Sequence, residues 1–141
     1  MFDVKLDIRP TADLLRSRGL QPGGSVQKVI DSETMRYMGD YMPRRQAGEL
    51  EHKMVTATIV GSGEVKIDGP FAHYLHEGIL YVDSVTGSAW SRKDDTKVPT
   101  DKELTYAGAP MRGKKFFDRM KTDHKVDILK AAQAAADRGG T

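Results

Sequence analysis

The sequence contains no cysteine, which excludes disulfide bonds and thiolate metal ligands. It also lacks a long apolar run, since no stretch approaches the roughly 20 residues that span a bilayer. The first residues alternate apolar and charged side chains, so we expect no signal peptide. A dominant charge is missing too, because 22 basic and 20 acidic residues leave a formal net charge of +2. This balance argues against strong electrostatic attraction to DNA or to an anionic membrane.

What the sequence does contain is typical of a globular protein. It has 141 residues, of which 38% are hydrophobic and 30% are charged. A chain of this length can bury one modest core, and its composition differs from that of disordered segments. We therefore expect a single domain over residues 1–141.

The first segment predicts a strand followed by a short helical turn. Residues 2–8 alternate apolar and charged side chains, a pattern typical of a half-buried strand, and Pro10 ends it. Leu14 and Leu15 then fit one helical turn that stops at Gly19.

The clearest helix lies between Ser25, a good N-cap residue, and Pro43, which cannot continue a helix. Between them, apolar and small side chains recur at spacings of three and four, as on one face of a helix. We interpret this stripe as core. Its members are Val26, Val29, Ile30, Thr34, Tyr37, Met38, Tyr41 and Met42.

The middle of the chain predicts a turn and then a β-hairpin. Residues 44–53 are polar and are expected to form a turn, with at most one turn of helix. Residues 54–60 and 64–68 are rich in β-branched side chains and flank Gly61-Ser62-Gly63, so we expect two hairpin arms there.

A short helix over residues 71–77 is expected next, with Gly78 as its stop. Residues 79–83 and 104–106 predict two further strands. Between these strands, residues 84–102 form a polar, interrupted segment that contains Trp90, and loops of this length usually carry function. We interpret this segment as a projecting arm with Trp90 as its anchor, the alternative being a tryptophan folded back on its own core.

The last third predicts a C-terminal helix after Pro110 and Gly113, followed by a frayed tail over residues 133–141. Its apolar stripe comprises Phe116, Phe117, Met120, His124, Ile128, Leu129 and Ala132. The sum is an α+β fold: a small antiparallel sheet of three or four strands, packed by the long helix of the N-terminal half and by the C-terminal helix.

The sequence offers little chemistry. His73, His76 and Glu77 would share a helix face that could hold a metal, but no third ligand lies at a suggestive spacing, so we interpret them as structural side chains. Ser62 sits in a turn rather than on a nucleophile elbow or a phosphate loop. We expect no catalytic residue, no metal and no cofactor, and therefore no enzyme.

Two basic clusters could contact nucleic-acid phosphates. The first is Arg44-Arg45, and the second consists of Arg112, Lys114 and Lys115. Neither is interleaved with aromatic residues, so surface solvation or a charged protein contact is favoured.

Five sequence marks occur in a recognisable order. They are Tyr41-Met42-Pro43 before Gly48-Glu49-Leu50; Gly69-Pro70-Phe71-Ala72-His73-Tyr74 up to Gly78; Tyr81-Val82-Asp83 leading to Thr86-Gly87-Ser88-Ala89-Trp90; Pro99-Thr100-Asp101 before Glu103-Leu104-Thr105-Tyr106; and Gly113-Lys114-Lys115-Phe116-Phe117. Together they resemble minor capsid proteins of tailed bacteriophages, related to head-tail joining and tail-completion proteins. Phe71 stands where that family commonly has tyrosine.

The resemblance implies a structural virion protein at the neck, assembled in the bacterial cytoplasm and acting as a homo-oligomeric ring. Such rings have on the order of six or twelve subunits. The implied partners are connector or stopper proteins and tail-tube proteins, with transient contact to packaged DNA and no membrane. Alternatives are a stopper or minor head component of the same virion, or a nucleic-acid-binding module.

The long polar segment and the basic clusters provide the expected interface residues, which are Trp90, Arg92 and Lys93 on the arm, and Arg44 and Arg45. The resemblance assigns the structural motif residues, which are Pro43, Gly48, Leu50, Pro70, Phe71, Ala72, Tyr74, Gly78, Phe116 and Phe117. The two glycines would supply backbone angles closed to other residues, and the aromatic residues would belong to the core.

Overall fold

The computed structural model describes residues 3–5, 9–44, 48–69, 71–106 and 110–139. Its elements follow in the order α1 (Thr11–Ser17), α2 (Ser25–Tyr41), α3 (Glu49–Ala57), α4 (Phe71–Glu77), β1 (Ile79–Asp83), β2 (Lys97–Glu103) and α5 (Phe116–Arg138). Within these described residues, five helices and one two-stranded antiparallel sheet confirm the expected α+β class.

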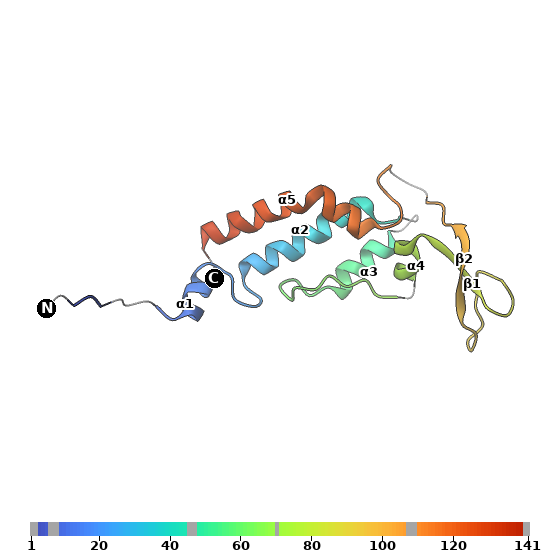
Figure 1. The fold of residues 1–141 in the computed structure, drawn as a ribbon, viewed down its shortest axis with the longest axis horizontal. Helices are drawn as coiled ribbons and strands as arrows, with labels where there is room; N and C mark the ends of the chain where they lie inside the picture. The colour runs from blue at the N-terminus through green and yellow to red at the C-terminus, as the bar shows by residue number, and fades with distance from the viewer. Residues whose placement is uncertain (1–2, 6–8, 45–47, 70, 107–109, 140–141) are drawn as a thin grey trace.

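The molecule is elongated. Figure 1 shows α2 and α5 side by side along the long axis, α3 and α4 below them, and the sheet at one end. The sequence predicted that the two long helices pack on the sheet. Instead, α2 and α5 pack on each other, and α4 is the helix that contacts β1. No helix of the described residues is long and apolar enough to cross a membrane.

The main core is rich in methionine. Its members are nearly inaccessible to solvent and come from three helices: Met38 of α2 and Met42 just after it, Met54 of α3, and Phe116 and Met120 of α5. Methionine is unbranched and adapts to irregular gaps, which suits helices that meet without a regular seam. A polar clasp joins α2 to α5, since the Tyr41 hydroxyl donates a 2.6 Å hydrogen bond to the Asp123 carboxylate.

The predicted helices α1, α2 and α4 are confirmed, but the predicted cap of α2 is wrong. Gly24, not Ser25, is the N-cap residue, and no side chain caps this helix. A side chain at Gly24 would collide with the chain that turns back on it, because its Cβ would lie 2.5 Å from the Gly19 carbonyl oxygen.

The first arm of the predicted hairpin is wrong. Residues 49–57 form α3, which places Leu50 and Met54 on one buried face. The prediction of at most one helical turn within residues 44–53 is therefore wrong as well, since this helix begins at Glu49 and runs beyond residue 53. The turn at residues 61–63 is present, and after it the chain is extended without being a strand. Thr58 joins the two extended pieces, since its hydroxyl bonds to both the amide and the carbonyl of Lys66.

Asp31 of α2 holds that turn in place. Its buried carboxylate accepts hydrogen bonds from the amides of Gly61 at 2.8 Å and Gly63 at 3.1 Å, and from the Gln27 amide group at 2.8 Å. Because both oxygens of this buried carboxylate accept hydrogen bonds, Asp31 fixes the turn at residues 61–63 to α2.

The two strands pair with one irregularity. Tyr81 lies opposite Pro99 and Asp83 opposite Lys97, with a register shift between Ile79 and Tyr81. The predicted strand at residues 79–83 is confirmed, whereas residues 104–106 are not a strand because β2 ends at Glu103. The prediction of a loop over residues 84–102 is wrong in its last part, because residues 97–102 belong to β2 and pair with β1. The described residues therefore hold two strands rather than three or four.

The two chain ends differ from expectation. Residues 3–5 are exposed and form no strand, and the rest of the predicted strand, at Phe2 and residues 6–8, lies outside the described residues. The tail does not fray at residue 133, because α5 continues to Arg138. Ala132 and Ala135 are buried against Val26, and their small side chains let the two helices approach closely.

Candidate interaction surface

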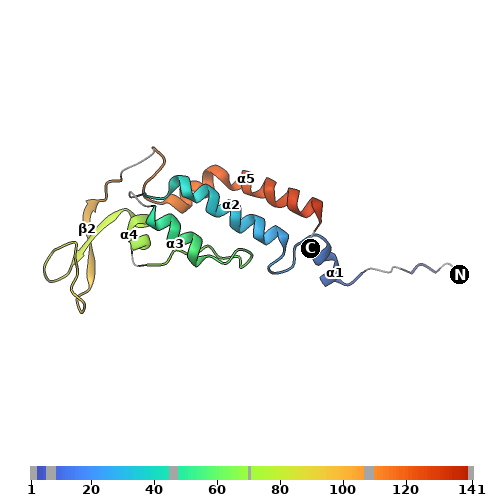
Figure 2. The same cartoon turned by 180° about the vertical axis from the view of Figure 1, so that it is seen from behind.

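The hairpin β1–β2 and the loop between its strands form the end of the molecule opposite the N-terminus (Figures 1 and 2). The sheet is attached through α4, where the rings of Tyr74 and Tyr81 lie 4.7 Å apart between centroids. The Lys97 ammonium lies 5.3 Å from the Tyr74 ring centroid and donates a 2.9 Å hydrogen bond to the Ala89 carbonyl. The loop is therefore tied to its own hairpin.

Asp83 organises this loop from its base. It is 1% exposed, and one carboxylate oxygen accepts hydrogen bonds from the amides of Val85 and Thr86, both at 2.8 Å. The other oxygen accepts from the amide of Arg92 at 3.2 Å. These bonds, led by that from Thr86, hold the pKa of Asp83 well below its ordinary value, against the opposing effect of burial. A charged Asp83 thus fixes both ends of the loop.

Trp90 lies within the loop that Asp83 organises and is 82% exposed. Its amide donates to the Ser88 hydroxyl, while its ring is not packed against the core clusters. The alternative of a tryptophan folded back on its own core is therefore wrong. Val85 in the same loop and Val98 on β2 are exposed as well, so the hairpin presents several apolar side chains to solvent.

Basic side chains accompany Trp90. Lys93 is exposed, and the Arg92 guanidinium forms a 3.0 Å ion pair with Asp95 while remaining largely exposed. Arg44 is exposed beside Gly48, after α2, in a different part of the chain. Arg45 lies outside the described residues. The structure thus groups three of the five predicted interface residues on one loop.

The predicted motif residues have structural surroundings, with exceptions. Gly48 and Gly78 have φ of 63° and 75°, in the left-handed region that glycine adopts readily. Pro43 follows α2, Leu50 and Phe116 are buried, and Ala72 and Tyr74 are half-buried. Phe71 and Phe117, expected in the core, are 51% and 38% exposed because they lie on the outer sides of their helices. Pro70 lies outside the described residues.

The second basic cluster is used internally. Arg112 donates to the carbonyls of Gly39 and Met42 at 2.8 and 2.6 Å, where it satisfies the C-terminal end of α2. Lys114 pairs with Glu103 at 2.9 Å, and Lys115 pairs with Glu77 at 3.0 Å. These cations join α2, α4, the hairpin and α5, which leaves them poorly placed to neutralise phosphates.

The histidine pair has aromatic and charged neighbours. Within the described residues, no group of three or more histidine, aspartate or glutamate side chains could hold a metal ion. His76 packs edge-on against Phe116, and Glu77 is paired with Lys115, whose hydrogen bond holds the pKa of Glu77 below its ordinary value. His73 lies 5.6 Å from the Tyr74 ring between centroids.

Two residues of this surface were missed by sequence reasoning. Asp83 and Lys97 lie at the paired ends of β1 and β2 and hold the loop between them. Asp83 begins a run of turn-forming residues, which is the one sequence signal that could have found it.

Comparison with protein-family models, with curated proteins and with solved structures gives no match. Function is therefore inferred from the residues of this chain. The hairpin combines an exposed tryptophan, exposed valines and exposed charged side chains of both signs on an internally braced loop. Such a surface is suited to binding another macromolecule.

Proposed function

We propose that this chain is a structural protein of a tailed-phage virion that forms a ring at the head-tail neck. The ring would be held by protein–protein contacts, with no catalytic step. The hairpin would bind a neighbouring subunit or an adjacent connector or tail-tube component. Support comes from the ordered sequence marks and from the geometry of the hairpin.

The observation that carries the proposal is the exposure of Trp90 on a braced loop. A tryptophan that is 82% exposed gains nothing from the folding of its own chain. The Asp83 hydrogen bonds limit the loop's freedom, so less conformational entropy is lost when a partner covers the ring. Buried tryptophan and arginine side chains commonly dominate the binding energy of interfaces.

The shape of the molecule suits a ring. The hairpin and the N-terminal segment lie at opposite ends of the long axis (Figure 1). Contacts between different surfaces of successive copies close into a ring when each copy is rotated relative to the last. A nucleic-acid module is less well supported, because Arg112, Lys114 and Lys115 are engaged within the chain.

The test is complementation of a phage that lacks this gene. Wild-type protein should restore joined particles, whereas Trp90→Ala should leave filled heads and free tails as seen by electron microscopy. Leu129→Ala, which removes an exposed apolar side chain on α5, is the matched control and should complement fully. Normal particles with Trp90→Ala would contradict the role of the hairpin.

The same images separate the neck assignments. Filled heads without tails are expected for a tail-completion protein, and emptied heads for a stopper that retains DNA. Particles that join normally without the protein would contradict the neck assignment and leave a minor head component.

A further inference from the structure

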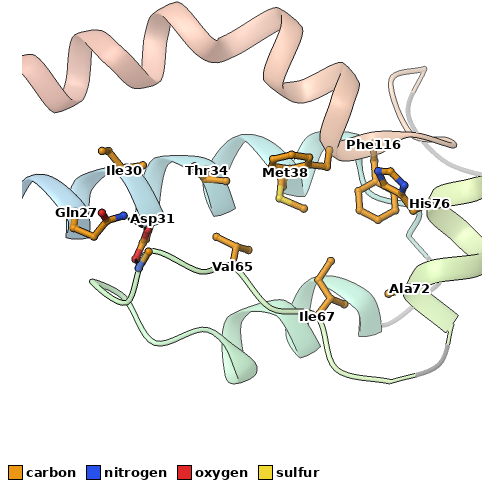
Figure 3. A pocket seen from close by; sticks show the side chains of 12 residues that line it. Gln27, Ile30, Asp31, Thr34, Met38, Val65, Ile67, Ala72, His76 and Phe116 are labelled. Atoms are coloured by element: carbon orange, nitrogen blue, oxygen red, sulfur yellow. Dashed lines mark hydrogen bonds between the residues drawn. The ribbon is translucent and has the colours of Figure 1, made fainter. Parts of the chain in front are cut away.

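A second surface lies on the helical body, away from the hairpin. A groove of about 500 Å³ runs along α2, between this helix and the extended chain at residues 63–67 (Figure 3). Ile30 and Met38 line it from α2, and Val65 and Ile67 from the facing segment, with Phe116 at one end. Its lining is mostly apolar, so filling it with apolar side chains would be favourable.

The wall opposite α2 is an extended chain with a regular alternation. Val65 and Ile67 are half-buried in the groove, while Glu64, Lys66 and Asp68 are exposed. Lys66 uses its amide and carbonyl toward Thr58. In an extended chain, successive residues direct these groups to opposite edges. The amides and carbonyls of Val65 and Ile67 therefore face the other edge. Among the described residues, no hydrogen bond is found for these four groups.

The chain contains one segment with the matching pattern. Residues 2–9 alternate the apolar side chains of Phe2, Val4, Leu6 and Ile8 with charged ones. Residues 3–5 are exposed, form no strand and lead away from the helical body (Figure 1). The sequence thus has the alternation of a half-buried strand, yet residues 3–5 do not pack against any surface of their own chain.

The charges of the two segments are complementary. Lys5, Asp7 and Arg9 read plus, minus, plus, and the exposed residues of the groove wall, Glu64, Lys66 and Asp68, read minus, plus, minus. Because both triplets are symmetric in sign, opposite charges meet whether the segments run parallel or antiparallel. In the register that sets Lys5, Asp7 and Arg9 against the groove wall, Asp7 lies opposite Lys66 in both directions. There it joins the Glu64 carboxylate, which lies 3.2 Å from the Lys66 ammonium.

The lengths also agree. The lined part of α2, from Gln27 to Met38, is about 16 Å long at the rise of an α-helix. An extended segment over residues 2–8 spans about 20 Å. The segment can therefore lie along the whole groove, with apolar side chains toward α2 and charged ones toward solvent.

We infer that residues 2–9 of one copy of this chain bind in the groove of a second copy, as a strand added beside residues 64–68. The occupant is a second copy because residues 3–5 lead away from their own body. Strand addition of this kind takes its affinity from main-chain hydrogen bonds and its specificity from alternate side chains. The inference concerns self-association and does not require the hairpin to bind anything.

Cysteine cross-linking tests the contact, because the natural chain contains no cysteine. Two full-length variants, Asp7→Cys and a tagged Lys66→Cys, are mixed and oxidised. A disulfide-linked heterodimer is expected on a non-reducing gel. The matched control replaces Lys66→Cys with Lys130→Cys, an exposed lysine of α5, and should give about tenfold less heterodimer because the thiols meet only by random collision.

Two results would overturn the inference. One is a heterodimer yield equal to that of the control. The other is an intramolecular disulfide in the Asp7→Cys/Lys66→Cys double variant with no heterodimer in the mixture, which would place the segment in its own groove.

Charge exchange gives an independent measurement. Asp7→Lys and Lys66→Glu should each weaken self-association measured by sedimentation, by roughly twofold to fivefold for an exposed ion pair. The double variant should recover the wild-type association constant, since the pair is restored with reversed sign. A double variant weaker than either single variant would contradict the pairing.

Failure of this contact can be told apart from failure of the hairpin. Trp90→Ala should leave the cross-link between positions 7 and 66 unchanged. If Trp90→Ala abolishes the joining of heads to tails while the cross-link between positions 7 and 66 still forms, only the hairpin contact is affected. If the cross-link does not form while particles still join normally, only the proposed groove contact is contradicted.

Discussion

The helical body and the hairpin are stabilised in opposite ways. In the body, the side chains of Met42, Met54 and Met120 are buried, although apolar residues such as Ile59 and Val126 are exposed. In the hairpin, the most buried side chain is the carboxylate of Asp83, while Trp90 and Val85 lie in solvent. Apolar burial therefore supports one region, and hydrogen bonds to a single charged group shape the other.

This difference separates the residues that stabilise the fold from those that are exposed to a binding partner. A core of adaptable side chains supplies the free energy of folding, which scales with the apolar area removed from water. The hairpin contributes little apolar burial of its own, so its exposed side chains are available to a partner. Mutations in the two regions should accordingly have different readouts.

The largest effect on stability is expected in the body. Met120→Ala removes a side chain that is 1% exposed and leaves a cavity between α2 and α5. The free energy of unfolding should fall by about 2–5 kcal/mol, measured by urea denaturation. Met111→Ala, at an exposed methionine before α5, should change it by less than about 0.5 kcal/mol. Equal effects would contradict the assignment of the core.

Removing the carboxylate of Asp31 should be the next largest change. In Asp31→Ala the buried amide of Gly61 and the partly buried amide of Gly63 lose their acceptor. We expect a loss of about 1–3 kcal/mol in urea denaturation. Asp94→Ala, at an exposed position, should have no measurable effect, and a similar loss there would point to net charge as the cause.

The Tyr41–Asp123 clasp should give the body a pH dependence. The hydrogen bond to Asp123, together with burial, raises the pKa of Tyr41 from 10.0 to about 12. The folded state then keeps a proton that the unfolded state has released, so stability is full below pH 10 and is lost between about pH 10 and 12. Tyr41→Phe should cost about 1 kcal/mol at neutral pH and lack this loss.

Urea denaturation at a series of alkaline pH values measures this difference. Tyr37→Phe serves as the control because Tyr41 still titrates in that variant. Parallel curves for wild type and Tyr41→Phe above pH 10 would show that the clasp is not formed.

Asp83→Ala should loosen the hairpin and leave the body intact. The amides of Val85, Thr86 and Arg92 lose their acceptor, so trypsin should cleave after Arg92 and Lys93 several-fold faster. Because the pKa of Asp83 is lowered, the loop is stabilised above the ordinary aspartate pKa and loosens as pH falls toward the folded value. Unchanged cleavage would mean that the loop is braced by other contacts. Asp101→Ala on β2 is the control.

Trp90→Ala should have the smallest effect on stability. An exposed side chain contributes little to folding, so the free energy of unfolding from urea denaturation should change by less than about 0.5 kcal/mol. Assembly, however, should be lost. A marked drop in stability would show that the indole packs on its own chain and would remove the contrast between the two regions.

Several elements could be predicted from the sequence because local signals agreed with the final packing. Gly78 is followed at once by a short apolar run, which placed the end of α4 and the bounds of β1 correctly. The failure at residues 54–57 has an equally local cause. Val55 and Thr56 are β-branched and favour a strand, yet Leu50 and Met54 are four residues apart and share the buried face of α3.

The site could be predicted only in part. Trp90, Arg92 and Lys93 are adjacent in sequence, so their grouping required no knowledge of the fold. The role of Asp83 could not be predicted, since its bond to Arg92 spans nine residues and depends on the path of the loop. The internal ion pairs of Lys114 and Lys115 likewise depend on how α4, the hairpin and α5 meet.

The position of Trp90 has a spectroscopic consequence. It is the only tryptophan in the chain, and it stands in water at one end of the molecule. Its fluorescence therefore reports on the hairpin tip and not on the core. A shift of the emission to shorter wavelengths on mixing with a partner would signal that the indole has been covered, and unfolding of the body would leave the emission nearly unchanged. The protein carries its own optical label at the surface where we expect it to bind.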